Sequence, residues 1–149
     1  MPKVLIVFHT LSGNTKDAAD AVAEGAGEMP GVDVVLKAGL SAGPEDLLGC
    51  DAVGLGTPDF FSYMAGGLKD FFDRTYYPTQ NQVNDLPCGV FVTHGGGGRA
   101  VDSVLQMVKS FKMKLVGDPV LVKSGPNDSE RESLRALGRR LAEATLGKA

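Results

Sequence analysis

Apolar residues along this chain fall into short unbroken runs, which alternate with longer stretches where they recur every three or four positions. An unbroken run of β-branched and other apolar residues is typical of a strand that is buried on both faces of a parallel sheet. We predict five such strands, at residues 3–8, 32–36, 51–56, 89–93 and 120–123. The recurring stretches between them predict helices with one buried face.

The predicted helices follow the strands one by one. They are a first helix that ends before Gly31, a short piece at residues 45–48, a helix that ends at Pro78, a helix at residues 100–111, and a last one from 128 to about 145. Glycine and proline break helices because one adds backbone freedom and the other removes a hydrogen-bond donor. Each predicted strand is therefore separated from the next by a helical segment.

Strands that alternate with helices predict an α/β fold, here a doubly wound five-stranded parallel sheet with right-handed crossovers and helices on both faces. The 149 residues suit a single domain, and no linker or low-complexity tract divides residues 1–149. In an open sheet of this kind, ligands bind beyond the carboxyl ends of the strands, where the strand order reverses. We therefore expect the chemistry in the loops after the first, third and fourth strands.

Composition and charge narrow the classes of function. Apolar residues make up 43% and charged residues 22%, and 15 Lys and Arg against 18 Asp and Glu give a formal charge of −3. This charge is too small to indicate a nucleic-acid or anionic-membrane partner. No apolar run is long enough for a membrane span, and we expect a cytoplasmic protein. Cys50 and Cys88 fit structural thiols, and with two histidines they predict no metal site.

The first candidate loop joins the first strand to a helix. Its residues are Thr10, Leu11, Ser12, Gly13, Asn14 and Thr15. They bring three hydroxyls, an amide side chain and the first main-chain N–H groups of a helix to one point, which suits a phosphate. The loop has no Lys or Arg and no GxxxxGK[ST] motif, so a P-loop for Mg-nucleotides is not predicted. The same polar residues would also serve as helix caps.

The second candidate loop is rich in aromatic residues. It consists of Thr57, Pro58, Asp59, Phe60, Phe61, Ser62, Tyr63 and Met64. Exposed loops rarely hold so many large apolar side chains, and a planar heterocycle stacked against them would explain the composition. The alternative is a hydrophobic plug over the edge of the sheet.

The third candidate loop follows the fourth strand and opens a helix. Its residues are Thr93, His94, Gly95, Gly96, Gly97 and Gly98. Four consecutive glycines allow the backbone to approach a ligand closely. The loop also satisfies a loose GxGxxA pattern, although the fourth strand is the wrong place for a dinucleotide-binding fingerprint. His94 is either a hydrogen-bonding group for the ligand or an ordinary surface histidine.

These loops resemble those of a known family. The run from Thr10 to Thr15 after a first strand resembles the FMN-phosphate loop of the flavodoxin-like family. The segment Gly56-Thr57-Pro58-x-x-Phe61-x-x-Met64-x-Gly66 closely resembles the tryptophan-repressor-binding-protein-type NAD(P)H:quinone reductases. The resemblance implies FMN as cofactor, a flavodoxin-like strand order of 2-1-3-4-5, all three loops as cofactor-binding segments, and His94 as the candidate catalytic residue.

Two functions within this family agree with the sequence. The first is a redox protein that passes electrons through bound FMN to or from a partner protein, and the second is an NAD(P)H-dependent enzyme that reduces a small quinone-like acceptor. Residues 124–127 lead directly into the last helix, where the quinone reductases carry a Gly-rich segment with a tyrosine. Carrier flavodoxins are typically more acidic and have an aromatic residue in the third loop. Whether copies of the chain form a homo-oligomer is left open.

A regulatory receiver-like domain has the same sheet topology and is the third class considered. Receivers need clustered acidic residues at the ends of the first and third strands. Here those ends read Phe8-His9 and Gly56-Thr57, which argues against this class.

Overall fold

Strands and helices alternate along the chain as the hydrophobic pattern predicts. A computed structural model describes residues 1–147. The strands are β1 (Lys3–Phe8), β2 (Asp33–Ala38), β3 (Ala52–Phe60), β4 (Tyr63–Met64), β5 (Pro87–His94), β6 (Lys114–Leu115) and β7 (Val120–Lys123). The helices are α1 (Asn14–Gly27), α2 (Pro44–Leu48), α3 (Gly66–Thr79), α4 (Ala100–Ser110) and α5 (Asp128–Leu146).

The main sheet is parallel and has the order β2-β1-β3-β5, with β6 and β7 sharing the outer edge of β5. The amino-terminal end of β5 pairs with β6, and its carboxyl-terminal half, Phe91 to His94, pairs with β7. Since β5 and β7 are the fourth and fifth predicted strands, the predicted order is confirmed. The two-residue strands β4 and β6 were not predicted.

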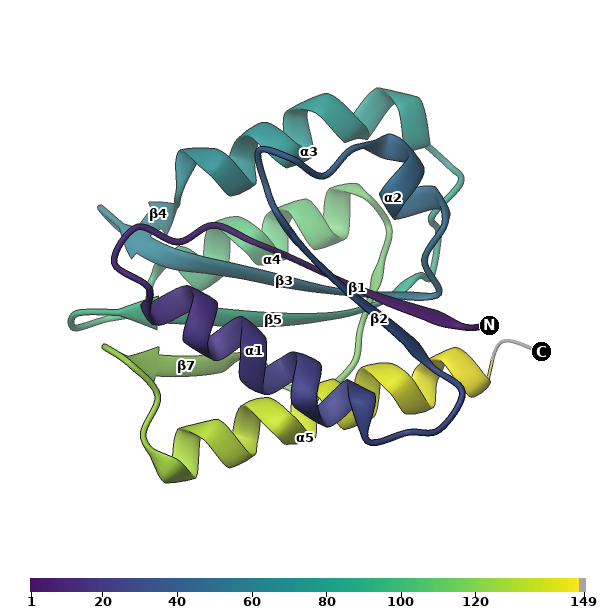
Figure 1. Cartoon of the computed structure of the whole chain (residues 1–149). Coiled ribbons are helices and arrows are strands. Elements are labelled where there is room, and N and C mark those ends of the chain that lie inside the picture. The colour runs from purple at the N-terminus through teal and green to yellow at the C-terminus, as the bar shows by residue number, and fades with distance from the viewer. Residues whose placement is uncertain (148–149) are drawn as a thin grey trace.

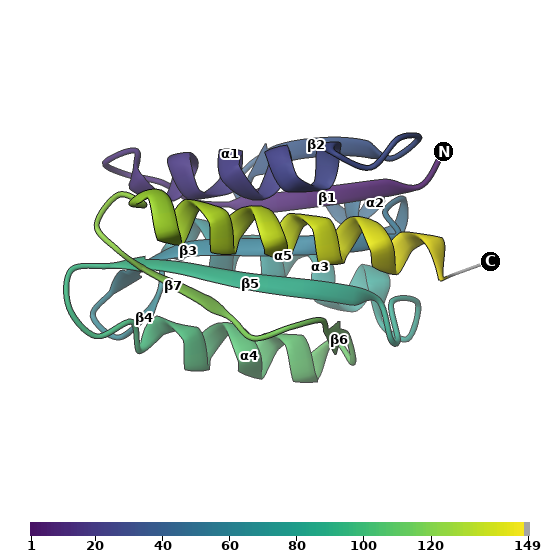
Figure 2. The same cartoon turned by 90° about the horizontal axis from the view of Figure 1, so that it is seen from below.

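Helices cover both faces of the sheet (Figures 1 and 2). Helices α1 and α5 lie side by side on one face, and α3 and α4 lie on the other. Alternate side chains of β1 pack into the cores on the two faces of the sheet, because neighbouring side chains of a strand point to opposite faces. Val4 and Ile6 belong to the core under α1 and α5, whereas Leu5 and Val7 belong to the core under α3 and α4. None of the helices within residues 1–147 is long and apolar enough to cross a membrane.

Glycines let α1 and α5 approach each other closely. A Cβ atom added to Gly25 would lie 1.9 Å from the carbonyl oxygen of Arg135, and one added to Gly138 would lie 1.9 Å from that of Val22. Small residues therefore set the distance between these two helices. Because α1 begins at the first candidate loop, this packing also fixes the position of that loop.

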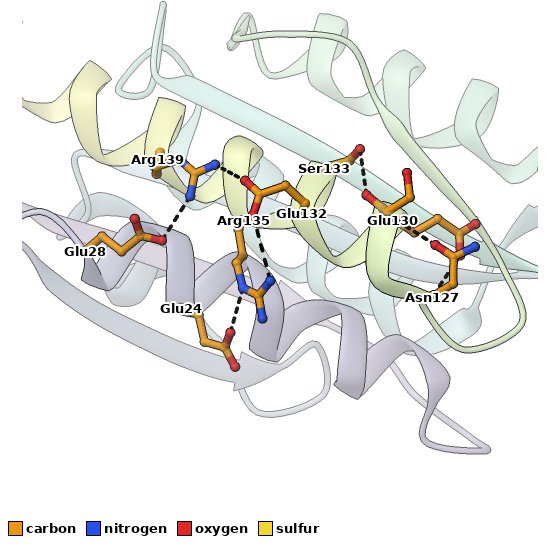
Figure 3. A network of polar contacts seen from close by, with 9 residues as sticks. Glu24, Glu28, Asn127, Glu130, Glu132, Ser133, Arg135 and Arg139 are labelled. Carbon is orange, nitrogen blue, oxygen red and sulfur yellow. Dashed lines mark hydrogen bonds and ion pairs between the residues drawn. The ribbon is translucent and has the colours of Figure 1, made fainter.

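Polar contacts border the same helix pair (Figure 3). The Arg135 guanidinium donates to Glu24 at 3.0 Å, and that of Arg139 donates to Glu28 at 3.0 Å. At the start of α5, Asn127 accepts a hydrogen bond from the main-chain N–H of Glu130 at 2.7 Å. The Glu130 carboxylate accepts in return from the main-chain N–H of Asn127, so the two residues form a capping box.

Several predicted boundaries need correction, and among them β5 runs from Pro87 to His94 instead of from 89 to 93. Strand β3 continues to Phe60 rather than ending at Gly56, because Thr57 and Pro58 pair with Val92 and Thr93 of β5. Part of the second candidate loop is therefore strand. Helix α3 continues through Pro78 and ends one residue later at Thr79, so the hydrogen bond that Pro78 cannot donate is lost only at the end of the helix. Strand β2 ends at Ala38 instead of residue 36, since its pairing with β1 extends that far.

Candidate cofactor site

The three candidate loops meet at the carboxyl edge of the sheet, as predicted. A hollow of about 170 Å³ lies between them. It is lined by Ser12, Asn14, Pro58, Asp59, Phe60, Thr93, His94, Gly95 and Ser124. These residues lie at the carboxyl ends of β3 and β5 or directly after β1, β5 and β7, so the loop after the fifth predicted strand also contributes.

A second hollow of about 340 Å³ adjoins the first. Its lining consists of Asp59, Phe61, Ser62, His94, Gly95, Gly96, Gly97 and Arg99. Asp59, His94 and Gly95 line both hollows, so the two form one elongated site. Its first part lies against the start of α1, and its second part lies between the β3–β4 hairpin (residues 57–64) and the glycine loop (residues 93–98).

The β1–α1 loop (residues 10–15) is shaped to receive an anion. Gly13, the N-cap of α1, has φ 102°, a value that favours glycine, and no side chain caps the helix there. The first N–H groups of a helix have no partner within the helix, so those of α1 are oriented to meet a negatively charged ligand. Thr10 supports the loop, because its hydroxyl accepts from the main-chain N–H of Gly13 at 3.1 Å. Ser12 and Asn14 line the hollow, whereas Leu11 is exposed.

Thr15 points into the protein and not into the site. Its side chain is buried, and its hydroxyl lies 2.7 Å from the hydroxyl of Thr93 at the end of β5. This pair joins the start of α1 to β5. Thr15 therefore supports the site from beneath, and it does not line either hollow.

The β3–β4 hairpin turns sharply at its tip. Asp59 and Phe60 pair with Met64 and Tyr63, which leaves Phe61 and Ser62 as a two-residue turn. Both turn residues have positive φ, 58° and 63°, as a hairpin turn of this length requires, although glycine or asparagine is usual there. The Phe61 side chain is fully exposed.

The remaining hairpin residues mostly support the turn. The buried Thr57 hydroxyl donates to the carbonyl of Pro58 at 2.7 Å and accepts from the N–H of Ala65 at 2.8 Å. Met64 is buried, and its N–H donates to the Ser103 hydroxyl at 3.0 Å. Tyr63 is half-exposed and lines neither hollow. Of the eight predicted residues, 58–62 line the two hollows, and contact of the eight with a ligand stays a prediction.

A hydrogen bond within the glycine loop fixes the orientation of the His94 ring. The Nδ1 atom of His94 accepts from the main-chain N–H of Gly97 at 3.1 Å. An accepting Nδ1 carries no proton, so the neutral ring carries its proton on Nε2. Gly97 and Gly98 have positive φ, 153° and 70°, which explains glycine at these two positions. Gly98 is buried and lies outside the lining of both hollows.

Two lining residues were missed by the sequence reasoning. Arg99 is an exposed residue at the N-cap of α4, on the rim of the second hollow. Ser124 has φ 61°, and its N–H donates to the His94 carbonyl at 2.8 Å. Ser124 could have been predicted as a site residue, because it directly follows the fifth predicted strand.

The arrangement suits a molecule with an anionic end and a flat polar end. The β1–α1 loop offers N–H groups and hydroxyls without a cation, and the hairpin and the glycine loop flank the other end of the site. A parallel sheet of this order with these three loops defines a nucleotide-cofactor-binding protein of the flavodoxin type.

Comparisons with known proteins agree with this class. Residues 36–127 match the family model described as NADPH-dependent FMN reductase. A flavodoxin of Aquifex aeolicus is 32% identical over 160 aligned positions, which cover 96% of this chain and 86% of that protein. An NAD(P)H dehydrogenase (quinone) of Archaeoglobus fulgidus is 28% identical, with 96% of this chain and 97% of that protein covered. The solved structure of an archaeal flavodoxin superimposes with a TM-score of 0.86 at 25% identity, covering 97% of this chain and 99% of that one.

The chain belongs to the flavodoxin-like FMN-binding family. Its cofactor is FMN, and its function is a redox function that depends on this flavin. The predicted family, fold class and cofactor are therefore confirmed. The role of each individual site residue remains a prediction.

Proposed function

We propose that this protein carries electrons between other redox proteins through its FMN. The observation that supports this proposal is the open form of the site. Only residues 124–127 connect β7 to α5, so this connection adds no segment long enough to cover the second hollow. A partner protein would thus reach the edge of the site directly.

The residues around the site divide into two groups in this proposal. The first N–H groups of α1, with Ser12 and Asn14, would hold the phosphate through uncharged donors. The hairpin and the glycine loop would flank the ring, with the exposed Phe61 at the outer edge. Bound FMN supplies the electron-accepting and electron-donating chemistry, and the protein supplies position and electrostatics.

A second candidate function is the reduction of a quinone-like acceptor by NAD(P)H. The second hollow favours it, because His94 and Arg99 both lie on its wall. The Nε2–H of His94 suits a quinone oxygen, and the Arg99 guanidinium suits a nucleotide phosphate. Two relatives named NAD(P)H dehydrogenase (quinone) are 27% and 28% identical to this chain over 80% and 96% of its length.

One anaerobic experiment separates the two functions. The FMN-loaded protein is mixed with NADH or NADPH and then with benzoquinone, while the 450-nm absorbance region of the flavin is followed. In parallel, protein reduced by dithionite is mixed with oxidised cytochrome c. A carrier is expected to reduce cytochrome c rapidly and to turn over slowly with pyridine nucleotides. Rapid turnover with benzoquinone would refute the carrier function and support the quinone reductase. An Arg99→Gln variant would then have a higher KM for the nucleotide.

We further infer that the whole chain acts as one cofactor-binding domain in a reducing compartment, the cytoplasm. All the lining loops arise from one sheet. The chain has two cysteines in 149 residues, and both are buried. A small number of buried cysteines is typical of proteins from reducing compartments, whereas small secreted domains are rich in cysteine.

A further inference from the structure

Asp59 makes two main-chain contacts that join separate segments of the site. It lies near the end of β3, where the hairpin begins. Its Oδ1 atom accepts from the N–H of Ser62 at 2.8 Å, and its Oδ2 atom accepts from the N–H of Ala100 at 3.1 Å. Ala100 is the first residue of α4 and directly follows the glycine loop and Arg99. One carboxylate therefore bonds both to its own hairpin and to the start of α4, the helix that directly follows the glycine loop and Arg99.

The contact with Ser62 supports a turn that is otherwise unfavourable. Phe61 and Ser62 both have left-handed backbone conformations, which side chains with a Cβ rarely adopt. Neither residue is a glycine or an asparagine. An aspartate that accepts from an N–H further along a turn stabilises such a turn. The Asp59 carboxylate thus helps to keep the tip of the hairpin in place.

The contact with Ala100 fixes the hairpin against α4. A carboxylate at a helix N-terminus interacts favourably with the helix dipole and satisfies one of its unpaired N–H groups. A second tie runs in parallel, because the Ser103 hydroxyl accepts from the N–H of Met64 and donates to the carbonyl of Ala100 at 2.6 Å. Hairpin and helix are therefore joined from two sides.

We infer that Asp59 is a positioning residue that sets the spacing between the hairpin and the start of α4, and with it the glycine loop that leads into α4. Each of its oxygens accepts a main-chain hydrogen bond from one of these two segments, and the residue lies on the wall of both hollows. This inference concerns the cofactor site of the proposed electron carrier and rests on flavin binding there, but not on the direction of electron flow. It predicts a defect at the ring end of the site and none at the phosphate end.

The test compares Asp59→Asn with Asp102→Asn. Asparagine keeps one accepting oxygen, so Asp59→Asn loses one of the two bonds. Asp102 is exposed in the same first turn of α4, so Asp102→Asn removes the same charge from the same helix end and leaves the Asp59 contacts intact. The affinities for FMN and riboflavin and the visible spectrum of the bound flavin are measured for both variants.

For Asp59→Asn we expect both affinities to fall by the same factor, on the order of tenfold. The spectrum of its bound flavin should shift toward that of flavin in water. Asp102→Asn should stay within about twofold of the parent for both ligands, as small effects of exposed charges suggest. Equal affinities in the two variants would overturn the inference. So would a loss for FMN without a loss for riboflavin, since this result would assign Asp59 to the phosphate.

A measurement on the flavin-free parent protein covers the case in which Asp59→Asn does not fold. The amide protons of Ser62 and Ala100 should exchange slowly with solvent before any flavin is added, because Asp59 already holds them. Where the variant folds, at least one of them should exchange about tenfold faster. Unprotected amides at both positions in the parent protein would refute the inference. If the parent protein bound FMN but reduced benzoquinone with NAD(P)H, the carrier proposal would fail and this inference would stand.

Discussion

Replacing Gly25 by alanine should separate the two helices that position the β1–α1 loop. The new Cβ atom would lie 1.9 Å from the carbonyl oxygen of Arg135, 2.6 Å from its carbonyl carbon and 2.8 Å from its Cα. These are main-chain atoms of a helix, so no side-chain rotation can relieve the contact. A normal separation of roughly 3.4 Å requires α1 and α5 to move apart by about 1.5 Å, in an interior packed at crystal density.

The expected cost follows from two opposing terms. Overpacking of a well-packed core typically costs about 1–3 kcal/mol, and the rigid partner places Gly25→Ala at the upper end of this range. Alanine regains up to about 1 kcal/mol through its higher helix propensity. We therefore expect the free energy of unfolding to fall by about 2 kcal/mol, and Tm to fall by about 4–8 °C for a chain of this size.

Gly27→Ala is the matched control. Gly27 belongs to the same helix, but a Cβ atom there would meet nothing within 4 Å. This variant should be as stable as the parent protein or more stable by a few tenths of a kcal/mol. Urea unfolding followed by circular dichroism, with saturating FMN and without it, gives the free energies. A difference between the two variants below about 0.5 kcal/mol would refute the packing argument.

Three further predictions address other parts of the molecule. Ser12→Ala should weaken FMN about tenfold and leave riboflavin unchanged in a fluorescence titration, because the hydroxyl is assigned to the phosphate; equal losses would remove this assignment. Burial raises the pKa of the Cys88 thiol from 9.0 to about 12. The unfolded chain therefore loses this proton at a lower pH than the folded protein does. The free energy of unfolding falls between pH 9 and 12 as a result, by at most about 1.4 kcal/mol per pH unit. In urea unfolding Cys88→Ala should show a flatter profile from pH 9 upward, and parallel profiles would contradict the raised pKa. Asn127→Ala breaks the capping box of α5 and should lower the free energy of unfolding by about 1 kcal/mol. The control Asn84→Ala, at an exposed position, should leave this free energy unchanged.

The hydrophobic pattern was sufficient for the five long strands and the two helical layers, whereas the strand order came from the resemblance to the flavodoxin-like family. It failed where pairing rather than hydrophobicity decides the structure. Thr57 and Pro58 break the apolar run of β3, yet β5 continues the pairing past them. Strand β6 consists of Lys114 and Leu115, too short for any periodicity to appear.

The loops that form the site were predictable, but several roles within them were not. Thr15 and Thr93 lie far apart in sequence, and only the packing of the start of α1 against the end of β5 brings their hydroxyls together. Asp59 and Ala100 are likewise 41 positions apart, so no local motif reveals their contact. Arg99 was missed because an exposed arginine after a glycine run has no distinctive pattern. Local sequence predicts where a ligand binds more readily than which groups support the site.

The direction of β1 and of α5 determines how this protein can be joined to another. Lys3 begins β1 and Leu146 ends α5, and both positions lie at the edge of the sheet opposite the cofactor site (Figure 1). A module fused at either position would leave the flavin edge uncovered, but it would start on the far side of the molecule. With a diameter of roughly 40 Å expected for this length, the path over the surface is about 60 Å, so a tether would need about 18 extended residues or more to bring a second redox centre around to the flavin. Shorter tethers would restrict electron transfer to encounters between separate molecules.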